Sequence, residues 1–531
     1  MSRFFVFAAA ALAAVIAAVA ALAGGSGAGW FFLVFAALAL LGVWDLVQPR
    51  HTLLRNYPLS AHVRWLFESI RPELRQYLFE SDRDAVPFSR EQRSLVYQRA
   101  KNDEARRPFG TREDVYQAGY SWLAHSAAPK AADQRDFRVT VGSESCNKPY
   151  NASLYNISAM SFGALGANAI RALNKGAKLG NFAHDTGEGG ISRYHREFGG
   201  DLIWELGSGY FGCRTDDGLF DPARFKDQAA NEQIKMVEIK LSQGAKPGHG
   251  GVLPGAKVTV EIAEARGVPI GRECVSPAAH RAFTTPLELM DFIARLREGS
   301  GGKPVGFKLC VGHRWEFMAM VKAMLQTGIA PDFIVVDGKE GGTGAAPLEF
   351  INHVGTPLVD GLTFVNNALI GAGLRDKIRL GASGKLISAF DLVWAHALGA
   401  DWCNAARGFM FALGCVQAQQ CHSNRCPTGI ATQDALRQRG LVVADKAERV
   451  ANFHRNTMHA LAEIIGAAGL THPSELQPRH LLVRQKNGEI LTAEKAYRAI
   501  APGEIVSGDC DKADYRTAWD LARADSFTPA G

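Results

Sequence analysis

Three cysteines late in the chain have a spacing that could hold a metal centre. Cys415, Cys421 and Cys426 lie within twelve residues, and a proline follows the last of them. Thiolates bind iron–sulfur clusters, and three ligands without an evident fourth nearby suit a three-iron cluster. Zinc is the alternative, with His422 as a fourth ligand, but adjacent Cys421 and His422 would have difficulty reaching one tetrahedral ion. Buried free thiols fit the spacing equally well, so three interpretations stay open.

Glycine-rich loops recur after short apolar runs through the middle of the chain. The sequence has 55 glycines among 531 residues, more than the roughly 7% that is usual. Six such loops occupy residues 161–163, 185–190, 242–248, 337–344, 382–385 and 406–408. Glycine lets backbone N–H groups approach a ligand closely, and successive N–H groups bind anions. One loop alone indicates a turn, whereas all six together predict a bound phosphorylated cofactor.

The elements that must position these loops alternate between strands and helices. Short apolar runs predict strands at 154–160, 182–184, 236–241, 272–275, 305–311, 333–336, 378–380 and 402–405, and helical patterns at 286–296, 315–325 and 385–398 separate the later ones. Eight strands over about 255 residues indicate an α/β fold of the (β/α)8 barrel type. A doubly wound open sheet is the second choice, because no glycine fingerprint for a dinucleotide follows the first strand.

A barrel predicts where the function lies, because barrel enzymes place their active sites in the loops after the strands. Barrels frequently bind phosphate with the loops that follow strands seven and eight. In this sequence those loops are residues 381–384 and 405–408.

The first 48 residues indicate a membrane hairpin. Uncharged residues 4–23 and apolar residues 30–47 are each close to the roughly 20 residues that cross a bilayer as a helix. Arg3 precedes the first run, and Arg50 and Arg55 follow the second, which predicts that both ends face the cytoplasm. We therefore expect an enzyme anchored in the inner (cytoplasmic) membrane, with the catalytic domain on the cytoplasmic side. A cleaved signal peptide is the alternative for the first run.

Composition and the pattern of apolar and polar residues divide the rest of the chain into three segments. We expect a helical collar at 49–150, the barrel with its cysteines at 151–435, and a mostly helical segment at 436–531. The formal net charge of +6 is too small for this length to predict nucleic-acid binding. Nine cysteines, an odd and sparse set, argue against a disulfide framework.

Five motifs in one order resemble the flavin-containing synthase domain of glutamate synthase. They are residues 157–165, 187–190, 243–248, 341–345 and the triple-cysteine stretch from Cys415 that ends at residues 426–429, and the similarity covers about residues 150–435. The resemblance implies an FMN-binding (β/α)8 barrel with a 3Fe–4S cluster. It also implies an oxidoreductase acting on CH–NH2 donors.

The resemblance assigns roles to individual residues. For the flavin ring it implies Ala159, Met160, Ser161 and Gln243, with Lys308 near flavin N1; for the FMN phosphate and its surroundings it implies Gly341, Gly342, Thr343, Gly384, Lys385, Ala406, Arg407 and Gly408. For the carboxylates of 2-oxoglutarate it implies Lys246 and Arg266, with Gln243 and Glu188 in the same pocket, and for the cluster it implies Cys415, Cys421 and Cys426. Glu188, Lys246 and Lys308 are the candidate catalytic residues.

The sequence also departs from the family pattern. We expect no glutaminase domain and no large C-terminal β-helical domain. Val252 stands where the family has glutamine, and residues 277–282 differ from the family stretch. These departures concern the substrate pocket, so the redox machinery is predicted more firmly than the substrate.

Three functions follow from these patterns. The first is reductive amination of a 2-oxo acid, 2-oxoglutarate by default, with free ammonia or ammonia from a partner. The second is an FMN oxidoreductase acting on another substrate, and the third is a non-catalytic membrane-anchored scaffold. Because no NAD(P) fingerprint is evident, ferredoxin or a separate reductase subunit is the expected electron donor.

Overall fold

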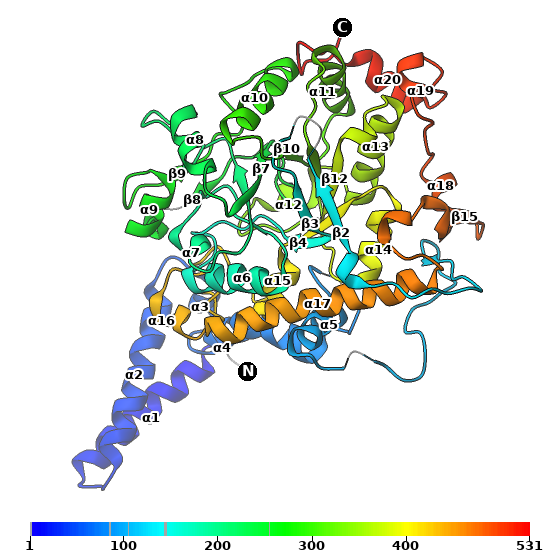
Figure 1. The fold of residues 1–531 in the computed structure, drawn as a ribbon. Helices are drawn as coiled ribbons and strands as arrows, with labels where there is room; N and C mark the ends of the chain where they lie inside the picture. The colour runs from blue at the N-terminus through cyan, green and yellow to red at the C-terminus, as the bar shows by residue number, and fades with distance from the viewer. Residues whose placement is uncertain (1–2, 84–85, 105, 143–145, 254) are drawn as a thin grey trace. The chain divides into compact units, whose positions relative to one another are not determined.

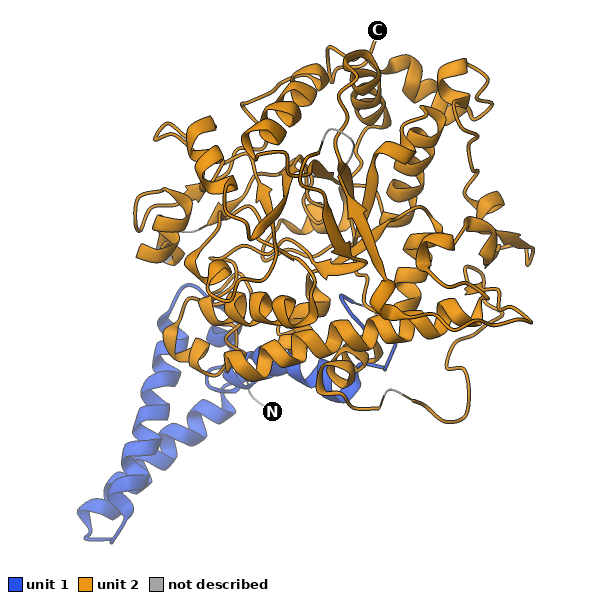
Figure 2. Cartoon of the chain, viewed as in Figure 1, with its two compact units in different colours: residues 1–90 blue, residues 91–531 orange. Residues whose placement is uncertain are grey.

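The computed structural model describes residues 3–83, 86–104, 106–142, 146–253 and 255–531. Two compact units make up the chain, Met1–Arg90 and Glu91–Gly531 (Figure 2). Their boundary falls inside the segment expected as one collar.

The elements described in the first unit are all helices. It contains α1 (Phe5–Leu22), α2 (Ala28–Val47), α3 (Thr52–Asn56), α4 (Ser60–Leu74) and the short π-helix η1 (Arg75–Phe79). Helices α1 and α2 pack against each other so closely that a Cβ on Gly42 would lie 2.3 Å from the Phe7 ring. Both helices are long and apolar enough to cross a membrane. The two apolar helices predicted from the sequence are therefore confirmed as helices.

The second unit is built on a closed barrel of eight parallel strands (Figure 1). In chain order the strands are β4 (Tyr155–Ile157), β5 (His184–Asp185), β6 (Leu202–Leu206), β7 (Ile234–Lys240), β10 (Val305–Leu309), β11 (Phe333–Asp337), β12 (Arg379–Ser383) and β13 (Trp402–Ala405). Strand β13 pairs with β4, and β7 pairs with β10, which closes the ring. The predicted (β/α)8 barrel is confirmed.

One predicted barrel strand was wrong and another was missed. Residues 272–275 contribute β9 (Cys274–Val275), which pairs antiparallel with β8 (Val252–Leu253) outside the barrel. The third barrel strand is β6, whose five residues are all buried. Glu205 stands inside its short apolar run, as Glu238 does in β7, and the sequence analysis assigned no strand there.

Helices connect the strands around the outside of the barrel. They are α6 (Ala167–Gly180), α7 (Arg193–Arg196), α8 (Pro222–Ala229), α9 (Val260–Arg266), α10 (Pro286–Gly299), α11 (Arg314–Thr327), α12 (Leu348–His353), α13 (Leu358–Gly371), α14 (Ala389–Ala397) and α15 (Arg407–Leu413). Local sequence sets several starts: Thr285 and Glu288 form a capping box at α10, and Ser388 and Asp391 form one at α14. The α14 cap shortens the helix that periodicity predicts from residue 385.

A small hairpin closes the amino-terminal end of the barrel. Strands β2 (Arg138–Val141) and β3 (Tyr150–Ser153) pair antiparallel. Their Val141, Tyr150 and Ala152 share one buried apolar cluster with barrel residues that include Phe333 and Trp402. Apolar packing fills this end of the barrel. A ligand can therefore bind only at the opposite end, where the carboxyl ends of the strands meet.

Further elements flank the barrel. They are α5 (Arg90–Lys101), β1 (Ser121–Leu123), α16 (Ala435–Arg439), α17 (Val443–Ala467), β14 (Leu481–Arg484), β15 (Ile490–Thr492), α18 (Ala493–Ala496), α19 (Glu504–Ser507) and α20 (Ala513–Leu521); single-turn 3-10 helices are η2 (Gln134–Asp136), η3 (Gly255–Lys257), η4 (Arg375–Lys377), η5 (Pro473–Glu475) and η6 (Pro478–His480). Strands β1, β14 and β15 form a three-stranded sheet. The expected collar thus ends in strands and loops, and the C-terminal segment is mostly helical with one small sheet.

Candidate functional site

Asp337, at the end of β11, ties three of the glycine-rich loops together. Its Oδ1 accepts a hydrogen bond from the Ser383 hydroxyl at 2.6 Å, and its Oδ2 accepts one from the Gly244 N–H at 2.8 Å. A Cβ on Gly244 would lie 1.9 Å from the carbonyl oxygen of Gly338, so only glycine fits there. The loops after β7, β11 and β12 therefore meet at one rim.

The loops after β4 and β5 join the same rim. A Cβ on Gly187 would lie 2.6 Å from the backbone nitrogen of Ser161, and Gly187 has a positive φ of 65°. Ala159 and Met160 precede Ser161 in the loop directly after β4. The three residues predicted to pass the flavin ring therefore lie against the second glycine-rich loop.

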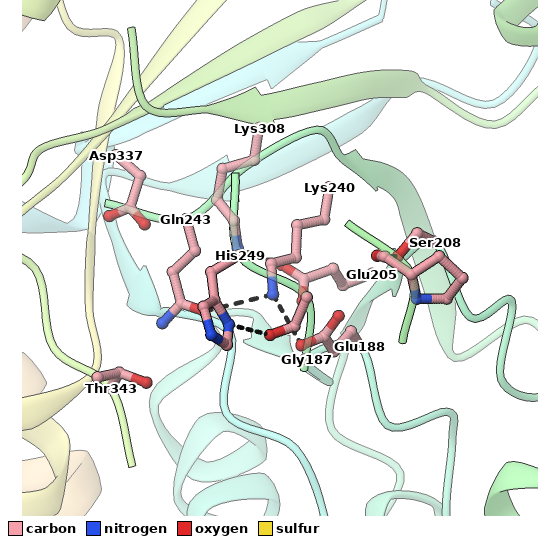
Figure 3. Close-up of polar contacts among 12 residues, drawn as sticks. Gly187, Glu188, Glu205, Ser208, Lys240, Gln243, His249, Lys308, Asp337 and Thr343 are labelled. Carbon is pink, nitrogen blue, oxygen red and sulfur yellow. Dashed lines mark hydrogen bonds and ion pairs between the residues drawn. The ribbon is translucent and has the colours of Figure 1, made fainter. Parts of the chain in front are cut away.

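Lys240, the last residue of β7, connects the predicted substrate residues to the predicted cofactor residues. Its Nζ donates to Glu188 Oε1 at 2.8 Å and to Gln243 Oε1 at 3.3 Å (Figure 3). Gln243 Nε2 in turn donates to the carbonyl oxygen of Gly342 at 3.0 Å. The sequence analysis missed Lys240, although it stands directly before the loop that was singled out.

Positive charge exceeds negative charge in this part of the rim. Burial would raise the pKa of Glu188, but the ion pair with Lys240 and the nearby charges of Lys246 and Arg266 lower it to about 2. Burial, and then the charge of Lys240, lowers the pKa of Lys246. Three cations thus face one carboxylate, which stays ionised at neutral pH.

Arg266 is the cation of this group that most needs an additional partner. Only 6% of it is exposed, and its Nε has no hydrogen-bond partner. Its guanidinium reaches the carbonyl oxygen of Phe162 at 3.4 Å and lies over the Phe211 ring. No carboxylate among the described residues forms an ion pair with it. A buried cation without a directly paired carboxylate is costly, so the geometry favours an anionic ligand beside Arg266.

A second charge cluster lies inside the barrel. Lys308 on β10 forms ion pairs with Glu205 and with Glu238 Oε1, the latter at 3.2 Å, and a carboxylate oxygen from each of Asp185, Glu205 and Glu238 lies within 4.8 Å of the other two. Burial alone would lower the pKa of Lys308, but Glu205 and Glu238 raise it well above its ordinary value. Burial and neighbouring carboxylates raise the pKa of Glu238 to about 7 and that of Asp185 well above its ordinary value.

The residues predicted to hold the FMN phosphate also meet at the rim. Gly384 follows β12 with a φ of 148°, and Lys385 follows it with a φ of 54°, so the chain turns sharply there. Ala406, Arg407 and Gly408 follow β13. Arg407 Nη2 donates to the carbonyl oxygen of Thr343.

This cradle fits a phosphorylated cofactor. A Cβ on Gly342 would lie 3.0 Å from Arg407 Nε, so a larger residue would push the Arg407 side chain away; Gly341 stands beside it in the same loop. Burial lowers the pKa of Lys385, which the charge of Glu340 partly offsets. Lys385 and Arg407 give the cradle its positive charge.

The cysteine loop lies beside the cofactor cradle. Arg407 Nη1 donates to Cys421 Sγ at 3.6 Å. Burial raises the pKa of Cys415, and the nearby charges of Cys421 and Cys426 raise it further. Cys415 therefore lies near the other two cysteines of this loop.

Cys426 lies in an environment suited to a thiolate. Burial would raise its pKa, but the Thr428 hydroxyl and backbone N–H groups lower it. Those N–H groups belong to Ala431, Thr428 and Ile430. Hydrogen bonds to sulfur are one way in which proteins tune iron–sulfur sites, but metal binding by these cysteines stays a prediction.

The residues that depart from the family pattern lie at the edge of the site. Val252 is 52% exposed, whereas a Cβ on the preceding Gly251 would lie 3.2 Å from Glu188 Oε1. The Val252 side chain therefore meets solvent over about half of its surface. His280, within the second departure, is buried, and its Nε2 lies 2.9 Å from the carbonyl oxygen of Lys240.

The structure thus gathers the predicted site residues at one end of the barrel, while their roles stay predictions. Sequence reasoning missed Lys240 and three buried acids, Asp185, Glu205 and Glu238. The available signal was a carboxylate inside an apolar strand run, as at Glu205 and Glu238. A buried charge of this kind needs a partner.

Comparisons with known proteins agree with the resemblance to glutamate synthase that the sequence motifs indicate. Residues 121–471 match the family model described as the conserved region in glutamate synthase. The glutamate synthase large subunit-like protein YerD of Bacillus subtilis is 37% identical over 497 residues, covering 86% of this chain and 94% of that protein. The archaeal-type glutamate synthase [NADPH] of Thermotoga neapolitana is 36% identical over 313 residues, covering 59% of this chain and 58% of that protein.

A third relative and a solved structure complete the comparison. The archaeal glutamate synthase [NADPH] of Methanocaldococcus jannaschii is 36% identical over 329 residues, covering 60% of each chain. A sulfite-bound flavocytochrome b2 variant aligns with a TM-score of 0.41 and 11% identity, covering 84% of this chain and 91% of that one. That structural likeness is too low to inform the function.

Proposed function

This chain belongs to the glutamate synthase family, and from that premise we propose that it reductively aminates a 2-oxo acid. The default substrate is 2-oxoglutarate, which would be converted to glutamate with free ammonia or with ammonia supplied by a partner. The family assignment makes the chain an FMN-dependent oxidoreductase of the glutamate synthase type, acting on CH–NH2 donors. The substrate, the amino donor and the iron–sulfur cluster are proposals.

The surplus of positive charge at the rim carries this proposal. Arg266 and Lys246 would bind the carboxylates of a 2-oxo diacid, because a dicarboxylate supplies the counter-charges that the described residues lack. Glu188, ionised at neutral pH, would hold Lys240 in place and accept a hydrogen bond from the incoming amine. When bound, FMN supplies the hydride that reduces a 2-imino acid.

Lys308 would act below the substrate residues as a fixed positive charge. Its carboxylate partners raise its pKa, so it stays protonated and does not serve as a general base. A cation near flavin N1 favours the reduced anionic ring. The proposal therefore gives Lys308 an electrostatic role and gives Lys246 a substrate-binding role.

We further propose that Cys415, Cys421 and Cys426 hold a 3Fe–4S cluster. A series of hydrogen bonds connects the substrate residues to the cysteine loop and supports this proposal. Lys240 contacts Gln243, and Gln243 contacts Gly342. In the same loop as Gly342, Thr343 contacts Arg407, which also contacts Cys421. A cluster at the end of this series would stand beside the cofactor cradle and could pass single electrons to it. Ferredoxin or a reductase subunit would supply the electrons.

The two apolar helices of the first unit would anchor the enzyme in the inner membrane. Arg3, Arg50 and Arg55 flank them, while the turn between the helices has no basic residue. By the positive-inside rule both ends would lie in the cytoplasm, together with the catalytic unit.

Spectroscopy and turnover test this proposal in sequence. Detergent-solubilised enzyme should show the absorption bands of an oxidised flavin and the electron spin resonance signal of an oxidised three-iron cluster. Reduced enzyme should then form an amino acid from ammonia and a 2-oxo acid. Flavin and cluster without turnover on any of a range of 2-oxo acids would contradict reductive amination.

The cluster assignment has its own test. Cys426→Ala should remove the spin resonance signal and keep the flavin spectrum. Cys510→Ala is the matched control, since that thiol is also buried but lies outside the cysteine loop. An unchanged signal in the Cys426→Ala enzyme would contradict ligation by Cys426.

A second candidate function is oxidation or reduction of a different substrate with electrons delivered through the cluster. The replacement of the family glutamine by Val252 and the altered stretch 277–282 favour it. A substrate screen under reducing conditions distinguishes the two functions. The scaffold alternative would be revived only by carefully purified protein that contains no flavin.

A further inference from the structure

Helix α4 presents an apolar stripe whose side chains are exposed. Its apolar residues recur at helical spacing on one face: Val63, Leu66, Phe67 and Ile70. Their exposed fractions are 53%, 58%, 58% and 38%. The following turn adds three more exposed apolar side chains, Tyr77, Leu78 and Phe79. A contiguous apolar surface of this kind marks a binding surface.

The face of α4 beside the apolar stripe is charged. Arg64, Glu68 and Arg71 lie at helical spacing on that side, and Arg64 Nε pairs with Glu68 Oε1 at 2.9 Å. A helix with one apolar face and one charged, arginine-containing face is the type that lies in the plane of a membrane interface.

The start of α4 is fastened to the end of the second apolar helix. Asp45 is fully buried; its Oδ2 accepts the Leu59 N–H at 2.9 Å, and its Oδ1 lies 2.9 Å from His62 Nε2. Arg55 Nε also donates to the carbonyl oxygen of Leu46 at 3.2 Å. The apolar stripe therefore begins at the level where the long apolar stretch of α2 ends.

We propose that α4 lies along the surface of the bilayer that α1 and α2 span, with Val63, Leu66, Phe67 and Ile70 inserted below the headgroups. The inference rests on the proposed membrane anchor. Between residues 50 and 75 the chain has five arginines and two glutamates, so the headgroups favoured are anionic. The hairpin and α4 together then form one anchor, in which the buried Asp45 fixes the angle between its spanning and interfacial parts.

Photo-crosslinking of the full chain in vesicles tests the placement. A benzophenone amino acid replaces Leu66 or Phe67 on the apolar face, and Arg64 or Glu68 on the charged face, in vesicles of phosphatidylcholine and phosphatidylglycerol. We expect lipid adducts from the first pair to exceed those from the second at least several-fold. Replacing the phosphatidylglycerol by phosphatidylcholine should lower the yield at Leu66.

The other possible occupants of the stripe would be identified by the same adducts. Adducts between position 66 and peptides of residues 91–531 would mean that the catalytic unit covers the stripe, and adducts to a second copy would mean a dimer. Either result, or equal lipid labelling on both faces, overturns the inference.

A control position in the first apolar helix distinguishes failure of the interfacial-helix proposal from failure of the proposed membrane anchor. The same photo-reactive group at Leu12 or Val15, both exposed on α1, should label lipid whether or not α4 does. Labelling at Leu12 without labelling at Leu66 would reject only the interfacial helix. No lipid labelling at Leu12 would reject the anchor and with it this inference.

Discussion

Two charge clusters in the same barrel have opposite balances. The interior cluster has one cation, Lys308, among three carboxylates that lie within 4.8 Å of one another. The rim cluster has three cations around Glu188 as its one carboxylate. The two are neighbours, since Lys308 and Lys240 are register partners on adjacent strands.

The difference shows which cluster is complete. Raised pKa values in the interior let carboxyl groups keep protons, so that cluster can balance its charge without a ligand. The rim cannot do so, because arginine does not lose its proton in proteins and Glu188 is already ionised. The interior cluster therefore needs no ligand for its charge balance, whereas the rim cluster keeps a surplus of positive charge, which the proposed function assigns to binding an anionic substrate.

The largest expected effect comes from removing the only cation of the interior cluster. Lys308→Met leaves Glu205 and Glu238 buried without a counter-charge, which should lower the free energy of unfolding by about 3–5 kcal/mol. Chemical denaturation followed by circular dichroism measures it.

The Glu205→Gln change, added to Lys308→Met, should restore part of that loss, because one fewer buried carboxylate then needs a counter-charge. If Lys308→Met unfolds at the same denaturant concentration as the unchanged protein, the interior cluster does not depend on its lysine.

The two clusters should respond to pH in opposite directions. Because the pKa of Glu238 is raised to about 7 from an ordinary value of 4.5, the folded protein holds a proton that the unfolded chain releases. The free energy of unfolding should therefore fall as pH rises from about 4.5 to 7, by at most about 3 kcal/mol. The Glu238→Gln enzyme should lose this slope.

Glu188 should produce the opposite slope in acid. Its pKa is lowered to about 2 from 4.5, so its stabilising contribution is fully present above about pH 4.5. It should be lost as pH falls toward 2, and Glu188→Gln should remove that part of the acid dependence. A profile unaffected by either variant would contradict the electrostatic contrast between the clusters.

Arg266→Met should affect binding far more than folding. Loss of a charged hydrogen-bonding partner for a substrate carboxylate should raise KM by roughly 10- to 100-fold, or about 1.5–3 kcal/mol. The free energy of unfolding should change by less than about 1 kcal/mol, since the removed charge has no carboxylate partner. Steady-state kinetics and denaturation measure the two effects.

Arg193→Met is the control for this variant, because Arg193 pairs with surface glutamates outside the rim. An unchanged KM in the Arg266→Met enzyme would place the substrate carboxylates elsewhere.

The smallest expected effect is that of Val252→Gln. Val252 is half exposed, so the new amide should meet solvent and alter the apparent binding free energy of 2-oxoglutarate by no more than about 0.5 kcal/mol. A large gain in activity on 2-oxoglutarate would instead show that position 252 selects the substrate, as the second candidate function requires.

The sequence predicted the barrel because seven of its eight strands lie in short apolar runs, and glycine-rich loops follow six of these strands. Strand β6 was not assigned; its Glu205 forms an ion pair with Lys308 from a strand 103 residues later. Residues 272–275 form a strand as predicted, but Cys274 is buried and Val275 is exposed, and the strand pairs antiparallel with β8 outside the barrel. Lys240 could not be assigned either, since its partners Glu188 and Gln243 meet only in the folded rim.

One anaerobic experiment tests the central claim most directly. The flavin of the purified enzyme is reduced, and its absorbance is followed after addition of 2-oxoglutarate, ammonia, or both. We predict that the oxidised flavin spectrum returns only when both are present, with one glutamate formed per flavin reoxidised. A flavin that stays reduced with both present, or that is reoxidised equally without ammonia, would contradict reductive amination at this rim.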